Sequence, residues 1–244
     1  MDKTKLLTFI EKYNLGGSIE SVKLVADGKA LKVGFVAEDK TLAGNVTLKS
    51  CDIEASELCI FETARLKTFL KSLIEDDVKI TLRKEDDRLV GIFLGDTRKT
   101  INVVLADASV IPKAPNVKAP KDFDVEIPID QNFIDDFVTS KNALPDVDSF
   151  TLMMNKAGDK LELVVGYAAI NSNRITVNIT PTAGKDELAA PISFNANYFR
   201  EILLKNQEST GAVFRVSATG IASISFSTDA FDSNYFLIKK EIES

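Results

Sequence analysis

The chain has 244 residues, a formal net charge of −6 and no histidine, with 45% hydrophobic and 27% charged residues. This composition is typical of a folded protein, and no apolar run reaches the roughly 18 residues that a membrane-spanning helix needs. We therefore expect a cytoplasmic protein without a cleaved leader. The absence of histidine excludes Ser/His and Cys/His nucleophilic sites and removes the commonest metal ligand.

In the first half, apolar residues at helical spacing between Leu6 and Tyr13 predict a helix. A second helix is predicted at about Ala64–Glu75, with Thr63 as its N-cap. Alternating or continuous apolar runs predict strands between and after these helices. The predicted strands are Ile19–Val25, Leu31–Val36, Leu42–Leu48, Leu58–Phe61, Val78–Leu82, Leu89–Leu94 and Thr100–Leu105.

The second half repeats the same order of elements. Helices are predicted at about Asp130–Lys141 and Ala196–Asn206, with Asn195 as the N-cap of the latter. The predicted strands are Phe150–Met154, Leu161–Val165, Ile175–Ile179, Pro191–Phe194, Ala212–Ser217, Ile221–Ser227 and Asn234–Lys239.

The two halves also repeat in sequence. FIEKY at Phe9–Tyr13 returns as FIDDF at Phe133–Phe137, and CIFETARLKTFLKS at 59–72 returns as ISFNANYFREILLK at 192–205. The second alignment pairs core positions, Phe61 with Phe194 among them, and the basic residues Lys67 and Arg200. We therefore predict an α+β protein of two similar domains, each with two helices packed on antiparallel sheets.

The boundary between the copies is marked by proline. The segment VIPKAPNVKAP at Val110–Pro120 holds three of the seven prolines of the chain. Because proline removes a backbone donor and stiffens the chain, this segment predicts an extended connector. The expected division is a first domain at 1–109, a connector at 110–122 and a second domain at 123–244.

Basic side chains collect on the outer face of some predicted helices. On Ala64–Glu75, the face opposite the apolar residues carries Arg65, Lys67 and Lys71. A solvated helix face is the ordinary interpretation of such a pattern, whereas recurrence on several helices favours contact with a phosphate backbone. The third predicted helix is acidic, with Asp135 and Asp136, so its role stays open.

No catalytic constellation is predicted. Cys51 and Cys59 have neither metal-knuckle nor redox-pair spacing and are interpreted as small core residues. The carboxylates at Asp76–Asp77, Glu85–Asp87 and Asp135–Asp136 are adjacent in sequence, and neighbouring side chains mostly point apart. With no phosphate-binding glycine loop, we expect neither an enzyme nor a metal or other cofactor.

Two copies of a helix–strands–helix–strands unit, a proline-bearing connector and the final segment NYFLIKKEIES at Asn234–Ser244 resemble the DNA polymerase sliding clamps. The resemblance covers the whole chain and is closest to two-domain, trimer-forming clamps of T-even-like tailed phages. It implies the duplicated DNA-clamp fold and a non-enzymatic homotrimeric ring. Such a ring would encircle double-stranded DNA without sequence preference, engage a clamp loader and tether the replicative polymerase, in the host cytoplasm if the protein is viral.

The resemblance also implies roles for residues. Those expected to face DNA are Lys3, Lys5, Lys12, Arg65, Lys67, Lys71, Lys141, Arg200 and Lys205. Those expected to form an apolar pocket for a partner peptide are Val110, Ile111, Val117, Phe236, Leu237 and Ile238. Those expected at the subunit interface are Thr100, Ile101, Val103 and Leu105 of one chain and Ile175, Val177 and Ile179 of the next.

A different class of function stays open at this stage. A duplicated α+β structural or assembly subunit that never binds DNA would have the same composition, the same repeat and the same absence of catalytic residues.

Overall fold

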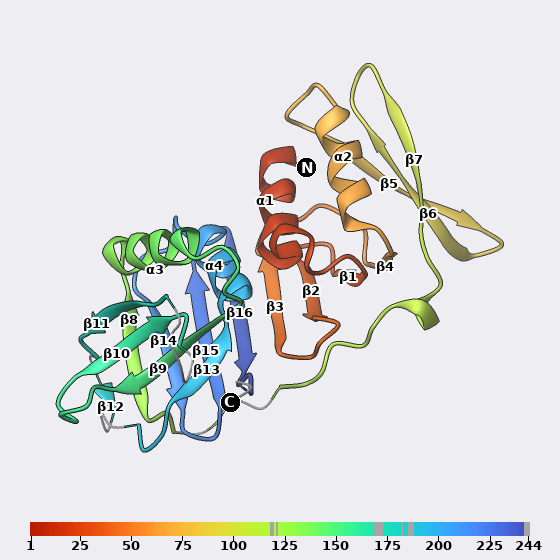
Figure 1. Cartoon of the computed structure of the whole chain (residues 1–244). Coiled ribbons are helices and arrows are strands. Elements are labelled where there is room, and N and C mark those ends of the chain that lie inside the picture. Colours follow the sequence, from red (N-terminus) through yellow and green to blue (C-terminus); the bar gives the residue numbers. More distant parts are fainter. Residues whose placement is uncertain (118–119, 121, 168–172, 182, 185–187, 242–244) are drawn as a thin grey trace. The chain divides into compact units, whose positions relative to one another are not determined.

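The computed structural model describes the chain except residues 118–119, 121, 168–172, 182, 185–187 and 242–244 (Figure 1). The chain divides into two compact units. Unit 1 consists of Met1–Glu38, Gly44–Pro115 and Thr228–Ser233, and unit 2 consists of Asp39–Ala43, Asn116–Ser227 and Asn234–Ser244. Part of the predicted connector, at 118–119 and 121, lies outside the described residues.

Unit 1 contains two α-helices and two sheets among the described residues. The strand order is β4-β1-β2-β3 in one sheet and β5-β6-β7 in the other. Its elements are α1 Lys3–Asn14, β1 Val22–Ala26, β2 Leu31–Val36, β3 Leu42–Leu48, β4 Ser56–Ile60, α2 Thr63–Ser72, β5 Lys79–Glu85, β6 Arg88–Gly95 and β7 Thr100–Val104. A 3-10 turn, Leu15–Gly17, ends α1, and another, Ala108–Val110, follows β7.

Unit 2 repeats this plan within its described residues. Its strand orders are β11-β10-β9-β13 and β12-β8-β14-β15-β16. Its elements are β8 Val125–Ile129, α3 Gln131–Ala143, β9 Ser149–Met154, β10 Leu161–Val165, β11 Ile175–Ile179, β12 Ala183–Gly184, β13 Ile192–Asn195, α4 Ala196–Leu204, β14 Ala212–Ser217, β15 Ile221–Ser227 and β16 Phe231–Ile238.

The order of elements makes the two copies comparable strand by strand. Strands β1 to β4 correspond to β9, β10, β11 and β13, and strands β5 to β7 correspond to β14 to β16. Strands β8 and β12 have no counterpart among the described residues of unit 1. The predicted α+β class and duplicated arrangement are confirmed.

Phenylalanine rings form the centre of unit 2. The ring centroid of Phe150 on β9 lies 5.1 Å from that of Phe137 on α3 and 4.8 Å from that of Phe199 on α4. Phe199 in turn lies 4.7 Å from Phe214 on β14, and all four side chains are buried. Aromatic pairs contribute about 0.5–1.5 kcal/mol beyond the area that they bury. This cluster therefore fixes both helices onto both sheets of the unit.

The two repeats differ by one residue where the strand leads into the second helix. Phe194 is buried in β13, whereas Phe61 lies beyond β4 and is 55% exposed. Ile60 pairs with Val22 just as Phe194 pairs with Phe150, so Ile60 is the true counterpart of Phe194. The predicted pairing of Phe61 with Phe194 is therefore wrong.

The second helix of each unit begins in a different way. Asn195 accepts hydrogen bonds from the backbone N–H groups of Asn197 (2.9 Å) and Tyr198 (3.1 Å), as an N-cap does. Thr63 is instead the first residue of α2, and Glu20 accepts a bond from the N–H of Ala64 (2.9 Å). The N-cap prediction is confirmed for Asn195 and wrong for Thr63.

No helix in the described part of the chain has the length and apolar character to cross a bilayer.

Strand β8, which precedes α3, was not predicted because Pro128 interrupts it. Proline cannot donate to a ladder and is confined to sheet edges. Strand β8 pairs fully with β14 on one side. On its other side, the described residues of β12 pair only with Val125 and Glu126, so Pro128 lies where no outward donor is needed.

Candidate nucleic-acid interface

The two helices of each unit lie side by side and are joined by polar contacts (Figure 1). In unit 1, Nζ of Lys67 on α2 lies 3.6 Å from Oε1 of Glu11 on α1. In unit 2, Nε of Arg200 on α4 donates to Oδ1 of Asn142 on α3 at 3.0 Å. Lys67 and Arg200, the paired basic residues of the repeat, thus both bridge the two helices of their unit.

The predicted DNA-facing lysines of α1 have three different environments. Lys3 donates from Nζ to the carbonyl oxygens of Leu73 (3.0 Å) and Ile74 (3.3 Å) beyond the end of α2. Lys5 is exposed. Lys12 is only 1% exposed, and its Nζ lies 5.2 Å from the centre of the Phe231 ring. Burial removes Lys12 from the solvent-facing set, so its expected place on the DNA-facing surface is not retained.

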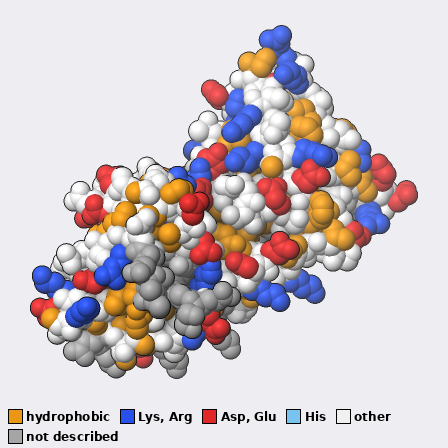
Figure 2. All heavy atoms as spheres, viewed as in Figure 1, with side chains coloured by type: hydrophobic (Ala, Val, Ile, Leu, Met, Phe, Trp, Pro, Cys, Tyr) orange, Lys and Arg blue, Asp and Glu red, His pale blue; other side chains and the backbone are white. Residues whose placement is uncertain are grey.

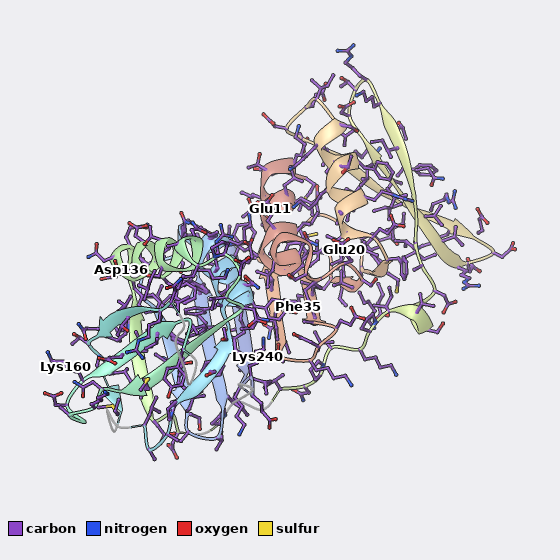
Figure 3. The ribbon with its side chains drawn as sticks, viewed as in Figure 1. Glu11, Glu20, Phe35, Asp136, Lys160 and Lys240 are labelled. Atoms are coloured by element: carbon purple, nitrogen blue, oxygen red, sulfur yellow. The ribbon has the colours of Figure 1, made fainter. Side chains whose placement is uncertain are left out.

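Helix α2 carries two exposed basic side chains, Arg65 and Lys71. Arg65 is exposed and forms an ion pair with Glu62 (Nε–Oε2 2.9 Å). Lys71 is exposed and has no ion pair within the described residues. Figure 3 shows Glu11 on α1, the helix that faces α2, and Glu20 below the first turn of α2. Lys71 and Arg65 are therefore the residues of α2 that would lose the least free energy of desolvation and ion pairing on contact with a phosphate.

The helices of unit 2 are less basic at their surface. Lys141 is 4% exposed, and its Nζ donates to the carbonyl of Pro145 at 3.0 Å. Burial, and then the nearby Arg200, lower the pKa of Lys141. Lys141 is therefore also dropped from the solvent-facing set. Arg200 remains partly exposed, and one of its nitrogens contacts Glu201 at 2.5 Å.

Acidic side chains stand beside these basic ones. Asp135 and Asp136 of α3 are exposed, and Figure 3 shows Asp136 projecting from that helix. Figure 2 shows Lys and Arg side chains interspersed with Asp and Glu side chains on the face in view. A surface of mixed sign supports few phosphate contacts, so any binding to nucleic acid through it would be weak, with a small salt slope. The basic candidates that remain exposed or partly exposed are Lys3, Lys5, Arg65, Lys67, Lys71, Arg200 and Lys205.

The strands nominated for the subunit interface are both edge strands. Strand β7 is the last strand of its sheet in unit 1, and β11 is the last of its sheet in unit 2. Leu105 lies just past β7, where its N–H donates to Val90 at 3.0 Å. Val103 packs inward, whereas Val104 is 70% exposed. The remaining nominated residues, all partly or fully exposed, are Thr100, Ile101, Ile175, Val177 and Ile179.

A shallow groove of about 230 Å³ lies beside β11 in unit 2. Val177 and Ile179 line it from the strand, and Ile127 and Phe133 line it from β8 and α3. Asp130, Asp136, Asn178 and Thr180 also line this groove, so its surface is partly polar. An edge strand with a groove at its side can accept both the backbone and the side chains of an added strand.

The residues nominated for a peptide pocket differ in exposure. In unit 1, Val110 is 55% exposed and Ile111 is buried. In unit 2, Leu237 is fully buried in β16 and belongs to the core. The others in unit 2, each of intermediate exposure, are Val117, Phe236 and Ile238.

The start of the connector packs on strand β2 of unit 1. A Cβ atom built on Gly34 would lie 3.0 Å from Cβ of Ala114. This approach is tighter than ordinary van der Waals contact, so the side chain of any other residue at position 34 would displace the connector.

The described residues contain no cluster of three or more Asp, Glu or Cys side chains placed to hold a metal ion. Both cysteines are free and buried, and burial raises the pKa of each thiol. Asp77 contacts the amino group of Met1 at 2.7 Å, and Asp76 lies 3.8 Å from Nζ of Lys3. Asp76 and Asp77, one of the adjacent carboxylate pairs of the sequence, thus serve as ion-pair partners.

Comparison with known proteins gives a result at the level of fold. No family model and no curated protein matches the chain. Among solved structures, Proliferating Cellular Nuclear Antigen from Entamoeba histolytica aligns with a TM-score of 0.70 at 15% identity, over 99% of this chain and 97% of that one. The PCNA2–PCNA3 complex from Sulfolobus tokodaii aligns with a TM-score of 0.69 at 12% identity, over 98% of this chain and 97% of the other. The chain has the fold of the sliding clamps.

Proposed function

We propose that this protein is a DNA sliding clamp: a homotrimeric ring that encircles double-stranded DNA and tethers the replicative DNA polymerase. The observation that carries the proposal is the clamp fold over 99% of the chain. The function requires no chemical step, because a closed ring raises processivity by topology alone. It would act after opening by a clamp loader.

Ring closure through β7 and β11 is supported by the position of each strand in its own unit. Strand β7 is the last strand of its sheet in unit 1, and β11 is the last strand of its sheet in unit 2. Each can therefore pair with a strand of another chain. A head-to-tail contact of this kind closes into a ring when the rotation from one subunit to the next is correct. We propose a ring of six units, which requires three chains because each chain supplies two.

DNA contact would come from the exposed or partly exposed basic side chains, with Lys71 and Arg65 foremost. Few phosphate contacts give weak binding without sequence preference, which suits a ring that must slide. The acidic side chains of α3 would keep that segment of the ring away from phosphate.

Partner proteins would bring an apolar peptide to the surface beside the connector and β16. Within unit 2, Val117, Phe236 and Ile238 are partly exposed and supply apolar area for such a peptide. Polymerase and clamp loader would compete for this surface. The specific likeness to clamps of T-even-like phages stays a prediction.

Two measurements test the proposal. Sedimentation equilibrium at micromolar concentration should give a mass three times the chain mass of 26.7 kDa. After loading on nicked circular DNA, the protein should be retained in gel filtration and released when the circle is cut by a restriction enzyme. Retention that is unchanged by linearisation would replace the topological model with ordinary binding. A trimer with no retention at all would favour the alternative, a structural or assembly subunit.

A further inference from the structure

The three-stranded sheet of unit 1 has a second open edge, at β5, on the side opposite β7. Beyond β5 the described chain supplies only its first two residues. Val78 donates its N–H to the carbonyl of Met1 at 2.9 Å, and Asp2 forms an isolated bridge with Asp77. No described strand other than β6 pairs with β5 along Lys79–Glu85.

Unit 2 covers the same edge with a strand. β14, the counterpart of β5, pairs with β8 in antiparallel register from Ala212 opposite Ile129 to Val216 opposite Val125. β8 leads into α3 through the N-cap Asp130, just as Met1 leads into α1 through the N-cap Asp2. The fold therefore accommodates a fourth strand at this place, and the internal copy gives its direction.

A groove of about 790 Å³ in unit 1 lies at the end of this sheet where β5 begins, and it is lined by residues of β5, β6 and the turn between β6 and β7. Its volume is in the range of about 300–1,000 Å³ common to binding sites. Ile80, Val78 and Phe93 provide an apolar floor, and the groove lies entirely within unit 1. The groove therefore has space for the side chains of a strand that pairs with the start of β5.

The charge of the groove is negative at the end where β5 begins. The cationic groups that line it are Lys79 and the amino group of Met1. The amino group of Met1 pairs with Asp77 (2.7 Å) and Asp52 (3.3 Å). At the far end of β5, Lys84 pairs with Glu54 (3.2 Å) and Arg83 lies 3.8 Å from Glu85. The carboxylates that line the groove are Asp52, Glu75, Asp77 and Asp96.

We propose that the β5 edge docks an extended segment of a partner protein, which adds as an antiparallel strand and places Lys or Arg side chains against the carboxylates of the groove. An added strand that runs opposite to β5 ends beside Lys79 and Asp77, so the basic residues lie at its C-terminal end. Main-chain hydrogen bonds supply affinity, and the acidic end supplies specificity. The site leaves β7 free, and it does not depend on DNA binding.

The backbone donors that would serve the added strand can be named. The N–H of Val78 points to the open edge, where it meets Met1. Since N–H groups alternate along a strand, those of Ile80 and Leu82 point to the same edge. These two amides should therefore become protected from hydrogen exchange when the segment binds.

The test uses a fluorescein-labelled peptide of alternating Thr and Val that ends in two Lys residues, and a matched peptide that ends in two Glu residues. The protein variants are Asp52→Lys/Asp77→Lys, whose side chains are 70% and 89% exposed, and the control Asp135→Lys/Asp136→Lys on α3 with the same charge change. In fluorescence anisotropy, the Lys peptide should bind the wild type and the control alike and bind Asp52→Lys/Asp77→Lys at least about tenfold more weakly. The Glu peptide should show the reverse preference.

Hydrogen exchange separates strand addition from simple charge attraction. Saturation with the Lys peptide should slow exchange at Ile80 and Leu82. Equal affinity for both peptides, no binding at millimolar peptide, or protection confined to β7 or β11 would overturn the proposal. Protection of β5 that rises with protein concentration in the absence of peptide would also overturn it, because it would indicate pairing between copies of this chain.

Discussion

Nζ of Lys67 lies 3.6 Å from Oε1 of Glu11, so the basic face of α2 is tied to the neighbouring helix by an ion pair. Both side chains are partly accessible, and a pair of this kind contributes only about 0–1 kcal/mol. A phosphate can therefore replace Glu11 as the partner of Lys67 at little cost. In the other unit, Arg200 has two partners to exchange for a phosphate, the neutral acceptor Asn142 and the carboxylate of Glu201.

Replacement of Glu11 by Gln should strengthen retention on DNA. The change removes a competing carboxylate and leaves Lys67 charged, so we expect a gain of less than about fivefold, the equivalent of about 1 kcal/mol. The measurement is half-life on nicked circular DNA at several salt concentrations. Glu208→Gln, an exposed glutamate after α4, is the matched control. Weaker retention of Glu11→Gln would show that Lys67 does not contact phosphate.

Combined charge reversal should have the opposite effect. Lys67→Glu, Lys71→Glu and Arg200→Glu together should shorten the products of primer extension in the presence of polymerase and loader. Each lost phosphate contact lowers the salt slope of binding by about 1. Circular dichroism and sedimentation should match those of the wild type.

The matched control for this triple variant reverses three exposed lysines outside the helices, Lys29, Lys156 and Lys160. Unchanged product length in the helix variant at moderate salt would contradict the DNA-facing assignment. Equal losses in both variants would mean that overall charge, rather than position, controls processivity.

The sequence predicted the helices and most strands because their apolar periodicity is local. It also predicted β7 and β11, each of which lies at one edge of its sheet. Lys12 could not be placed in this way. Its burial depends on Phe231, which is more than 200 residues away, and the helical pattern around Lys12 carries no sign of it.

The other errors have the same physical origin. Glu20, from the loop before β1, supplies the acceptor at the start of α2, so the local preference for Thr at an N-cap was misleading. Strand β8 was missed because it contains Pro128. A strand can contain proline only where no neighbouring strand needs its N–H donor, and the sequence does not show which strands lie beside β8. Tertiary contacts determine the structure at such positions, and these contacts cannot be derived from the local pattern of a single sequence.

The substitution Asn102→Pro tests the role of the β7 edge. Leu105 donates its N–H to Val90 on β6, so by alternation the N–H of Asn102 points away from the sheet. Proline removes only that outward donor, and edge strands tolerate it. One lost backbone bond contributes about 1 kcal/mol, so the trimer should dissociate at a concentration at least about fivefold higher.

Sedimentation velocity across a dilution series gives this dissociation constant. Asn102→Ala keeps the donor and is the control. If Asn102→Pro assembles as well as Asn102→Ala, β7 does not form the ring contact.

The contact between Gly34 and Ala114 should position the connector. Gly34→Ala forces the two Cβ atoms to 3.0 Å, so the connector must move by some tenths of an ångström or more. We expect faster tryptic cleavage at Lys113, which is exposed, and a modest loss of stability of about 1 kcal/mol. The compensating change Ala114→Gly should restore slow cleavage in the double variant. Equal cleavage rates in all three proteins would show that the connector is not held at this point.

Acid should weaken the attachment of the β6–β7 turn to the end of α2. Asp96 accepts from the N–H groups of Ile74 and Lys99 at 2.8 and 2.7 Å, and these bonds lower its pKa from the ordinary 3.8 to about 2. Because the folded state has the lower pKa, the stabilisation is complete above pH 3.8 and is lost as pH falls toward 2. Urea unfolding from pH 6 to pH 2 should therefore show that Asp96→Asn is less stable than the wild type at neutral pH, with a difference that narrows below pH 4. A difference that stays constant over this range would mean that the folded protein does not favour the carboxylate form.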